Sequence, residues 1–193
     1  MYRIRFHGRG GQGMKTASRI LGSAFFLEGF EVQDAPRYGA ERRGAPIFAY
    51  VRASRQAINE RGIIHHPDLV VVADDSLVPI PAAGVLQGLD AHTLTLINSH
   101  TSAADWQQRL NLAGTVLILP AMEEVADRAE LPFVGTTCAG AAARLVGVIS
   151  RDALAGAIQA ELGALGAQLV EKNTERALHD YDLMEPHAGS VTE

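Results

Sequence analysis

The stretch Arg3-Ile-Arg-Phe-His-Gly-Arg-Gly-Gly-Gln-Gly-Met14 joins a predicted strand to a predicted helix through a turn rich in glycine. Polar and apolar side chains alternate from Arg3 to His7, which is typical of a strand. From Met14 to Glu28 the apolar residues recur at helical spacing, and Gly29 follows where a helix C-cap is expected. A strand, a glycine turn and a helix in this order indicate an α/β domain.

The rest of the chain continues this alternation. Further strands are predicted over 30–34, 46–52, 69–73, 93–98 and 115–119, and residues 56–64 are predicted to return antiparallel to 46–52. Helices are predicted over 138–149, 151–162 and 165–180, with Ser150 and Asp152 supplying N-terminal capping. We therefore expect one α/β domain over residues 1–184, a single open, mostly parallel, Rossmann-like sheet flanked by helices, with C-terminal helices. We expect residues 185–193 to form a frayed tail.

Length and composition narrow the class of protein. The 193 residues are 47% hydrophobic and 20% charged, so the chain can bury a core. No apolar run approaches the roughly 20 residues that span a bilayer, and the N-terminus has no apolar signal segment, so we expect a cytoplasmic protein without membrane contact. The single cysteine, Cys138, excludes an internal disulfide and a self-contained iron–sulfur cluster, which needs about four thiolates.

Charge is distributed unevenly along the chain. Residues 1–61 hold 11 Lys or Arg and 5 Asp or Glu, a net of +6, whereas residues 62–193 hold 6 and 17, a net of −11. The basic first third indicates a face for a phosphorylated ligand or an acidic partner, or arginines that pair with the acidic remainder of the same chain. A sequence pI of about 5.8 argues against nucleic acid as a partner.

The glycine turn contains a phosphate-binding pattern. Gly8, Gly10 and Gly13 satisfy G-x-G-x-x-G between a strand and a helix, where backbone N–H groups and the helix N-terminus face an anion. In a dinucleotide-binding protein Glu31 or Asp34 would supply the acid that contacts the ribose. A stand-alone NAD(P)-binding, Rossmann-like protein is therefore one interpretation, although that fingerprint does not call for the Arg9, Gly11 and Gln12 found here.

A second motif follows the predicted second strand. The polar loop Ala35-Pro-Arg-Tyr-Gly-Ala-Glu-Arg-Arg-Gly44 begins 22 positions after Gly13, the last residue of the glycine turn. Together the two motifs resemble the γ subunit of the 2-oxoacid:acceptor oxidoreductases, the pyruvate:ferredoxin oxidoreductase family, whose pattern is approximately G-x-G-G-Q-G followed by Y-G-x-E-x-R-G-G. The chain departs from this pattern at Ala45, where the family has glycine. The matching residues are Gly8, Gly10, Gly11, Gln12, Gly13, Tyr38, Gly39, Glu41, Arg43 and Gly44.

This resemblance implies a function that depends on partner subunits. The family oxidatively decarboxylates a 2-oxoacid to its acyl-CoA and passes electrons to ferredoxin or a similar acceptor. Thiamine diphosphate, magnesium and iron–sulfur clusters would belong to subunits of the alpha, beta and delta types. This chain would be an accessory subunit without catalytic residues or metal ligands, and the 2-oxoacid itself stays open. Its two loops would face the active-site cleft and help to bind coenzyme A through Arg9, Gly10, Gly11, Gln12, Gly13, Tyr38, Glu41, Arg42 and Arg43.

Four other features are given local roles. We expect His7 to make a local hydrogen bond and Asp74-Asp75 to form a turn or an N-cap. The adjacent His65 and His66 would point to opposite faces of a strand and so would not share a metal. Cys138 has no histidine base near it in sequence and is interpreted as a packing residue.

Overall fold

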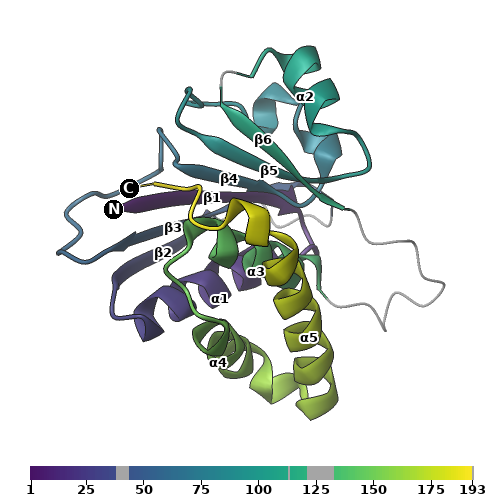
Figure 1. The fold of residues 1–193 in the computed structure, drawn as a ribbon. Helices are drawn as coiled ribbons and strands as arrows, with labels where there is room; N and C mark the ends of the chain where they lie inside the picture. The colour runs from purple at the N-terminus through teal and green to yellow at the C-terminus, as the bar shows by residue number, and fades with distance from the viewer. Residues whose placement is uncertain (38–43, 113, 121–132, 193) are drawn as a thin grey trace.

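A computed structural model describes residues 1–37, 44–112, 114–120 and 133–192, with only the backbone described for Pro36 and Arg37. In these residues the strands form one six-stranded sheet in the order β2-β3-β1-β4-β5-β6 (Figure 1). Neighbouring strands are parallel from β1 through β4 and β5 to β6, and β3 alone runs in the opposite direction, between β1 and β2. The strands are β1 (Tyr2–Arg9), β2 (Glu31–Arg37), β3 (Pro46–Ser54), β4 (Leu69–Val72), β5 (Leu94–Ser99) and β6 (Thr115–Pro120).

Helices cover the two faces of the sheet unequally. Four helices lie on one face, where α1 packs against β1, β2 and β3 and α3 packs against β4 (Figure 1). The other face carries α2 and short 3-10 turns. On the first face lie α1 (Met14–Leu27), α3 (Val134–Val146), α4 (Arg151–Leu162) and α5 (Ala167–Leu183); on the other lie α2 (Ala103–Leu110) and the 3-10 turns η1 (Asp75–Leu77) and η2 (Pro81–Ala83). No helix in the described part of the chain is long and apolar enough to cross a membrane.

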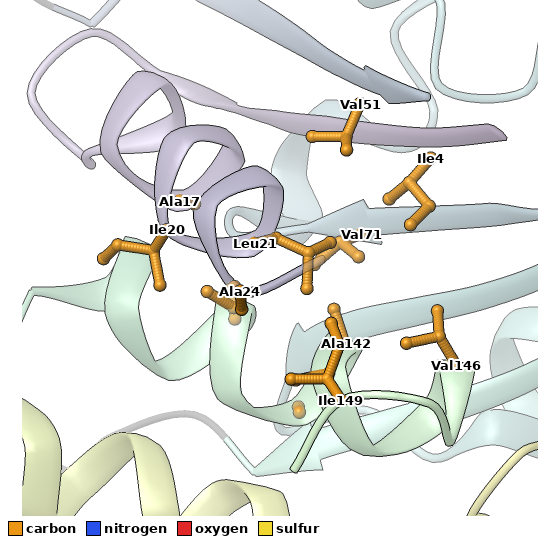
Figure 2. Packing of buried hydrophobic residues seen from close by; sticks show 14 of the residues in the cluster. Ile4, Ala17, Ile20, Leu21, Ala24, Val51, Val71, Ala142, Val146 and Ile149 are labelled. Atoms are coloured by element: carbon orange, nitrogen blue, oxygen red, sulfur yellow. The ribbon is translucent and has the colours of Figure 1, made fainter. Parts of the chain in front are cut away.

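The main core lies between α1, α3 and the sheet. Ile4 and Phe6 of β1 point into it, together with Val51 of β3 and Val71 of β4. Figure 2 shows Leu21 of α1 beside Val71 of the sheet, Ile20 on the side of α1 away from the strands, and Ala142 and Val146 of α3 in the same cluster. The core residues of α1 recur at the spacing that predicted the helix, because one side of a helix faces the sheet.

The opposite face of the sheet is divided into an apolar half and a polar half. Over β4, β5 and β6, side chains such as Val70 and Val72 form a second, smaller core with α2 and the 3-10 turns. Over β1 and β3 the face is polar, because every second residue of β1 is basic. We call these residues the polar row: Arg3, Arg5, His7 and Arg9.

Most of the elements predicted from the sequence are confirmed. The strands other than 56–64, the helix starting at Met14 and the three C-terminal helices all occur, and Ser150 caps α4 by accepting a hydrogen bond from the backbone N–H of Ala153 at 3.1 Å. Gly29 has the positive φ expected just after a helix end, 80°. The mostly parallel α/β sheet in one layer, flanked by helices, is confirmed as well.

Three predictions differ from the structure. The return strand over 56–64 is wrong: β3 pairs with β1 on one side and β2 on the other, so no edge of β3 is left for it. β2 continues to Arg37, so the polar loop begins later than expected. The tail predicted to fray instead forms η5 (Glu185–His187), and Val191 is buried with its N–H donating to Leu145 O at 3.0 Å.

Candidate functional site

The glycine turn forms a loop whose backbone needs glycine at two positions. Gly11 and Gly13 have φ values of 98° and 76°, in the left-handed region that other residues rarely adopt. Gly13 immediately precedes α1, which has no side-chain N-cap and no acidic residue in its first turn. Within the described residues, the N–H groups of Gly11 and Gly13 donate no hydrogen bond. The positive end of the α1 dipole therefore remains available to an anion.

The side chains of Gln12 and Asp74 support this loop through hydrogen bonds. The backbone N–H of Arg9 donates to Gln12 Oε1 at 2.7 Å, and Gln12 Nε2 donates to Asp74 Oδ2 at 3.2 Å. A Cβ at Gly8 would lie 2.7 Å from Cγ of Met14, so Met14 packs directly on the glycine, and it would lie 3.1 Å from Gln12 Oε1, a tight contact. Gln12 is thus a brace for the loop, which explains a glutamine that a dinucleotide fingerprint does not require.

Arg9 joins three elements at the end of the sheet. Its Nε donates to Asp74 Oδ2 at 3.0 Å, one terminal nitrogen donates to Gly44 O at 2.9 Å, and the other donates to the Ser76 hydroxyl at 2.8 Å. Asp74 in turn caps η1 by accepting from the N–H of Ser76, which confirms the capping role expected for this acid. Arg9 therefore makes the contact expected of a basic residue that pairs within its own chain.

The second motif meets the first through the backbone. The N–H of Gly10 donates to Ala45 O at 2.9 Å, and the N–H of Gly44 donates to Gly10 O at 3.3 Å. These bonds extend the pairing of β1 with β3 beyond Arg9 and Pro46. Ala45, where the family pattern has glycine, is accommodated in this pairing. The predicted site residues Tyr38, Glu41, Arg42 and Arg43 lie outside the described residues.

The N-terminus of α3 also reaches the glycine loop, and sequence reasoning missed this contact. A Cβ at Gly135 would lie 2.4 Å from Gly13 O and 3.3 Å from Gln12 O, so the two backbones approach closely. The N–H of Phe133, the N-cap residue of α3, donates to Asn173 Oδ1 at 2.9 Å, but Phe133 itself supplies no capping side chain and the first turn of α3 holds no acidic residue. In the described residues the N-termini of α1 and α3 therefore both lie at this loop, which strengthens its positive potential. The signal in the sequence was a glycine beside Thr136 and Thr137, but nothing there showed what it faces.

The acids expected of a dinucleotide site are badly placed. In the structure β3 separates β2 from β1, so Asp34 lies one strand farther from the glycine loop than the fingerprint requires. The Ser18 hydroxyl donates to Asp34 Oδ1 at 2.7 Å, and burial raises the pKa of this carboxyl. Glu31 is the first residue of β2, at the opposite end of the strand from the site. The arrangement does not favour NAD(P).

The single cysteine has the properties of a packing residue. Cys138 is fully buried in α3, and burial raises the pKa of its thiol to about 12. A thiol with such a pKa is almost entirely protonated at neutral pH and is a poor nucleophile or metal ligand. In the described ranges, His, Cys, Asp and Glu side chains form no group of three that could hold a metal ion.

Comparison with known proteins agrees with the motifs. Residues 3–182 match the family model described as pyruvate ferredoxin/flavodoxin oxidoreductase. The chain is 36% identical over 186 residues to the pyruvate/ketoisovalerate oxidoreductases common subunit gamma of Pyrococcus furiosus, covering 96% of this chain and 98% of the relative. It is also 36% identical over 190 residues to pyruvate synthase subunit PorC of Methanothermobacter marburgensis, covering 98% and 100%.

A solved structure shows the same fold. The crystal structure of pyruvate oxidoreductase subunit PORC from Thermotoga maritima superimposes with a TM-score of 0.76 at 28% sequence identity. The likeness covers 94% of this chain and 95% of that one.

Proposed function

This chain belongs to the pyruvate ferredoxin/flavodoxin oxidoreductase family as its gamma-type subunit, and from this we propose that its glycine loop holds coenzyme A beside the active site of the assembled enzyme. The enzyme would oxidatively decarboxylate a 2-oxoacid to its acyl-CoA and pass electrons to ferredoxin or a similar acceptor. Partner subunits of the alpha, beta and delta types would carry thiamine diphosphate, magnesium and the iron–sulfur clusters, which supply the decarboxylation and electron transfer. This chain would be an accessory, non-catalytic subunit acting in the cytoplasm.

The backbone pairing of Gly10 with Gly44 and Ala45 carries this proposal, because it joins the two motifs into one surface. Coenzyme A bears several phosphate charges, and this surface offers what a phosphate needs. The N–H groups of Gly11 and Gly13 are free of partners in the described residues, and two helix N-termini point toward them. The role of the chain is then to bind and orient the nucleotide end of coenzyme A, so that its thiol reaches the acyl group in the partner.

Arg9 has a supporting part in this proposal. Its guanidinium is engaged by Asp74, Ser76 and the Gly44 carbonyl, so it shapes the loop rather than offering a free charge. Tyr38, Glu41, Arg42 and Arg43 follow β2 in the sequence and precede Gly44, which pairs with Gly10. We propose that they complete the site, with the arginines contacting phosphate and Glu41 orienting an arginine.

A matched pair of glycine variants tests this proposal. A Cβ at Gly11 meets no atom within 4 Å, so Gly11→Leu would send its side chain into the space where the phosphate should lie. Gly166, before α5, has a φ of 105° against 98° for Gly11 and is equally open, so Gly166→Leu imposes similar backbone strain away from the loop. Loss of a charge-assisted hydrogen bond is worth about 1.5–3 kcal/mol, so we expect Gly11→Leu to raise the KM for coenzyme A about 10- to 100-fold.

The measurement uses the enzyme purified anaerobically through a tag on this chain, with partner subunits identified by mass spectrometry. The Gly166→Leu enzyme should keep the KM of the unaltered enzyme. Equal KM values for all three enzymes, with assembly intact, would show that the loop contacts only protein. Recovery of the chain without larger subunits would contradict the accessory role itself.

A further inference from the structure

A pocket of about 720 Å³ opens on the polar half of the sheet, on the opposite face from α1. The buried side chains of Arg5 and His7 line it from β1, and Phe48 and Tyr50 line it from β3. Ile63 and Gln87, from the segments that follow β3 and η2, contribute to its rim. We call this the basic pocket. Its volume lies within the range of small-molecule sites, about 300–1,000 Å³.

Arg5 brings a positive charge to the basic pocket that no carboxylate of the described residues balances. It is only 4% exposed, and its terminal nitrogens donate to the carbonyl oxygens of Ile64 at 3.4 Å and Val85 at 2.9 Å. Its Nε is buried without a partner. In the described part of the chain it has no ion pair, whereas Arg3 and Arg9 of the same row pair with Glu60 and Asp74. Burial lowers the pKa of Arg5 to about 10, which reflects the cost of an uncompensated buried charge.

His7 presents an acceptor beside this cation. Its Nδ1 lies 3.2 Å from Ala83 O, and because a carbonyl only accepts, Nδ1 carries the hydrogen. In the neutral ring Nε2 is then an acceptor, and it is buried without a partner. Burial and the neighbouring charge of Arg5 lower the pKa of His7 to about 3, so the ring is neutral at physiological pH. The pocket therefore combines an unbalanced cation with an unsatisfied hydrogen-bond acceptor two residues away.

We propose that the basic pocket binds a small organic anion, whose carboxylate or phosphate group compensates Arg5 and whose hydroxyl or N–H group donates to Nε2 of His7. An apolar or planar body of the same molecule would lie against Phe48 and Tyr50. The pocket volume of about 720 Å³ is large enough for a complete small molecule. The proposal concerns a different face of β1 from the glycine loop and stands whether or not that loop holds coenzyme A.

The test follows the ring nitrogens of His7 by NMR in the ¹⁵N-labelled full chain. The probe is 3-hydroxybenzoate, which combines a carboxylate, a donor and a planar body, and 3-hydroxybenzamide is its neutral counterpart. We expect saturable shifts of the His7 signals with the acid at millimolar concentrations or below. The amide should bind at least about tenfold more weakly.

Three variants identify the site. Arg5→Gln should weaken binding at least about tenfold, whereas Arg3→Gln, which alters an arginine of the same row outside the pocket lining, should leave it unchanged. Because Arg5→Gln alters a buried residue, Ala82→Trp provides a second test: Ala82 lines the pocket and is exposed, so the indole should block the pocket while thermal unfolding stays the same.

Equal binding by Arg5→Gln and by the unaltered chain, or equal binding of acid and amide, would overturn the proposal. The titration is repeated with the assembled enzyme. Binding that persists there supports a small-molecule site, and binding that disappears on assembly would mean that a partner subunit fills the pocket, which would also overturn it.

Discussion

The two faces of β1 differ in chemistry: one is apolar and packs into the main core, and the other carries the polar row. On one face Ile4 and Phe6 are fully buried against α1 and α3, where shape and apolar area determine the fit. On the other face Arg5 and His7 of the polar row are buried and Arg3 and Arg9 are half-buried, and each member needs a partner for its charge or its polar atoms. Arg3 and Arg9 at the ends have carboxylates, and Arg5 and His7 in the middle do not. The first face therefore supports stability, and on the second face Nε of Arg5 and Nε2 of His7 are left without hydrogen-bond partners in the described residues.

The largest effect should come from the apolar face. Phe6→Ala removes a fully buried ring from the core, and such truncations cost about 3–5 kcal/mol. Phe48, on the polar face, is half-buried beside His7, so Phe48→Ala should cost about 1–2 kcal/mol. Urea unfolding of the purified chain measures both, and similar losses would mean that the two faces contribute equally to stability.

The next effect concerns His7 and appears as a dependence on pH. Its folded-state pKa, about 3, lies below the ordinary value of 6.5, so the neutral ring contributes stability that is complete above pH 6.5 and is lost as the pH falls toward 3. Between pH 7 and pH 5 this loss should be about 2 kcal/mol. Burial is the main cause of this low pKa, and the positive charge of Arg5, which also lines the pocket, lowers it further.

The matched variant for this prediction is His7→Gln, which keeps a polar side chain but does not titrate. The difference in unfolding free energy between the unaltered chain and this variant should therefore change by about 2 kcal/mol between pH 7 and pH 5. A difference that is independent of pH would show that water reaches His7 and that the polar face is not desolvated.

A smaller effect is expected where the polar row ends at the glycine loop. Asp74→Ala removes the acceptor of Arg9 and of Gln12, and this partly exposed ion pair should contribute about 1 kcal/mol to stability. The expected consequence for function is larger, since the loop loses its brace: the KM for coenzyme A should rise severalfold in the assembled enzyme. Arg3→Gln breaks the comparable pair with Glu60 and should leave that KM unchanged.

The smallest effect is a gain in stability from a substitution in α4, on the side of the sheet covered by four helices. Gly156 is exposed in α4, and a Cβ there would meet only a methyl group of Leu27 at 3.4 Å, an ordinary contact. Gly156→Ala should therefore stabilise the chain by about 0.5–1 kcal/mol, because alanine favours the helix. Thermal unfolding measures this change. A loss of stability would mean that the packing of α4 on α1 is tighter than these contacts indicate.

The positions of the helices and strands could be predicted from the sequence, but the order of the strands in the sheet could not. Periodicity located β1 and α1 because each has one buried face, and capping chemistry located α4 at Ser150. Periodicity did not predict the strand order. Because β3 lies between β1 and β2, the expected hairpin at 56–64 does not form and Asp34 lies farther from the glycine loop. Such pairing depends on contacts between distant residues, which local patterns do not encode.

In the candidate site, too, local features could be predicted from the sequence and long-range contacts could not. The motifs identified the glycine loop because glycine, glutamine and their spacing are local features. They did not show that the guanidinium of Arg9 would be occupied by Asp74, or that Gly135 would pack on Gly13, since both contacts join residues more than 60 positions apart. Arg5 was not singled out at all. Its signal was a basic residue on a strand that the fold buries on both faces.

The bond between Gly10 and Ala45 continues the ladder that pairs β1 with β3, and this continuity has a consequence for errors in folding. A slip of one residue in that ladder would turn Phe48 and Tyr50 toward α1 and would send Val51 to the other side. The same slip would separate Gly44 and Ala45 from Gly10. A misregistered chain would therefore lose its core and the geometry of its glycine loop together, so a correctly formed glycine loop would report that β1 and β3 have paired in the native register.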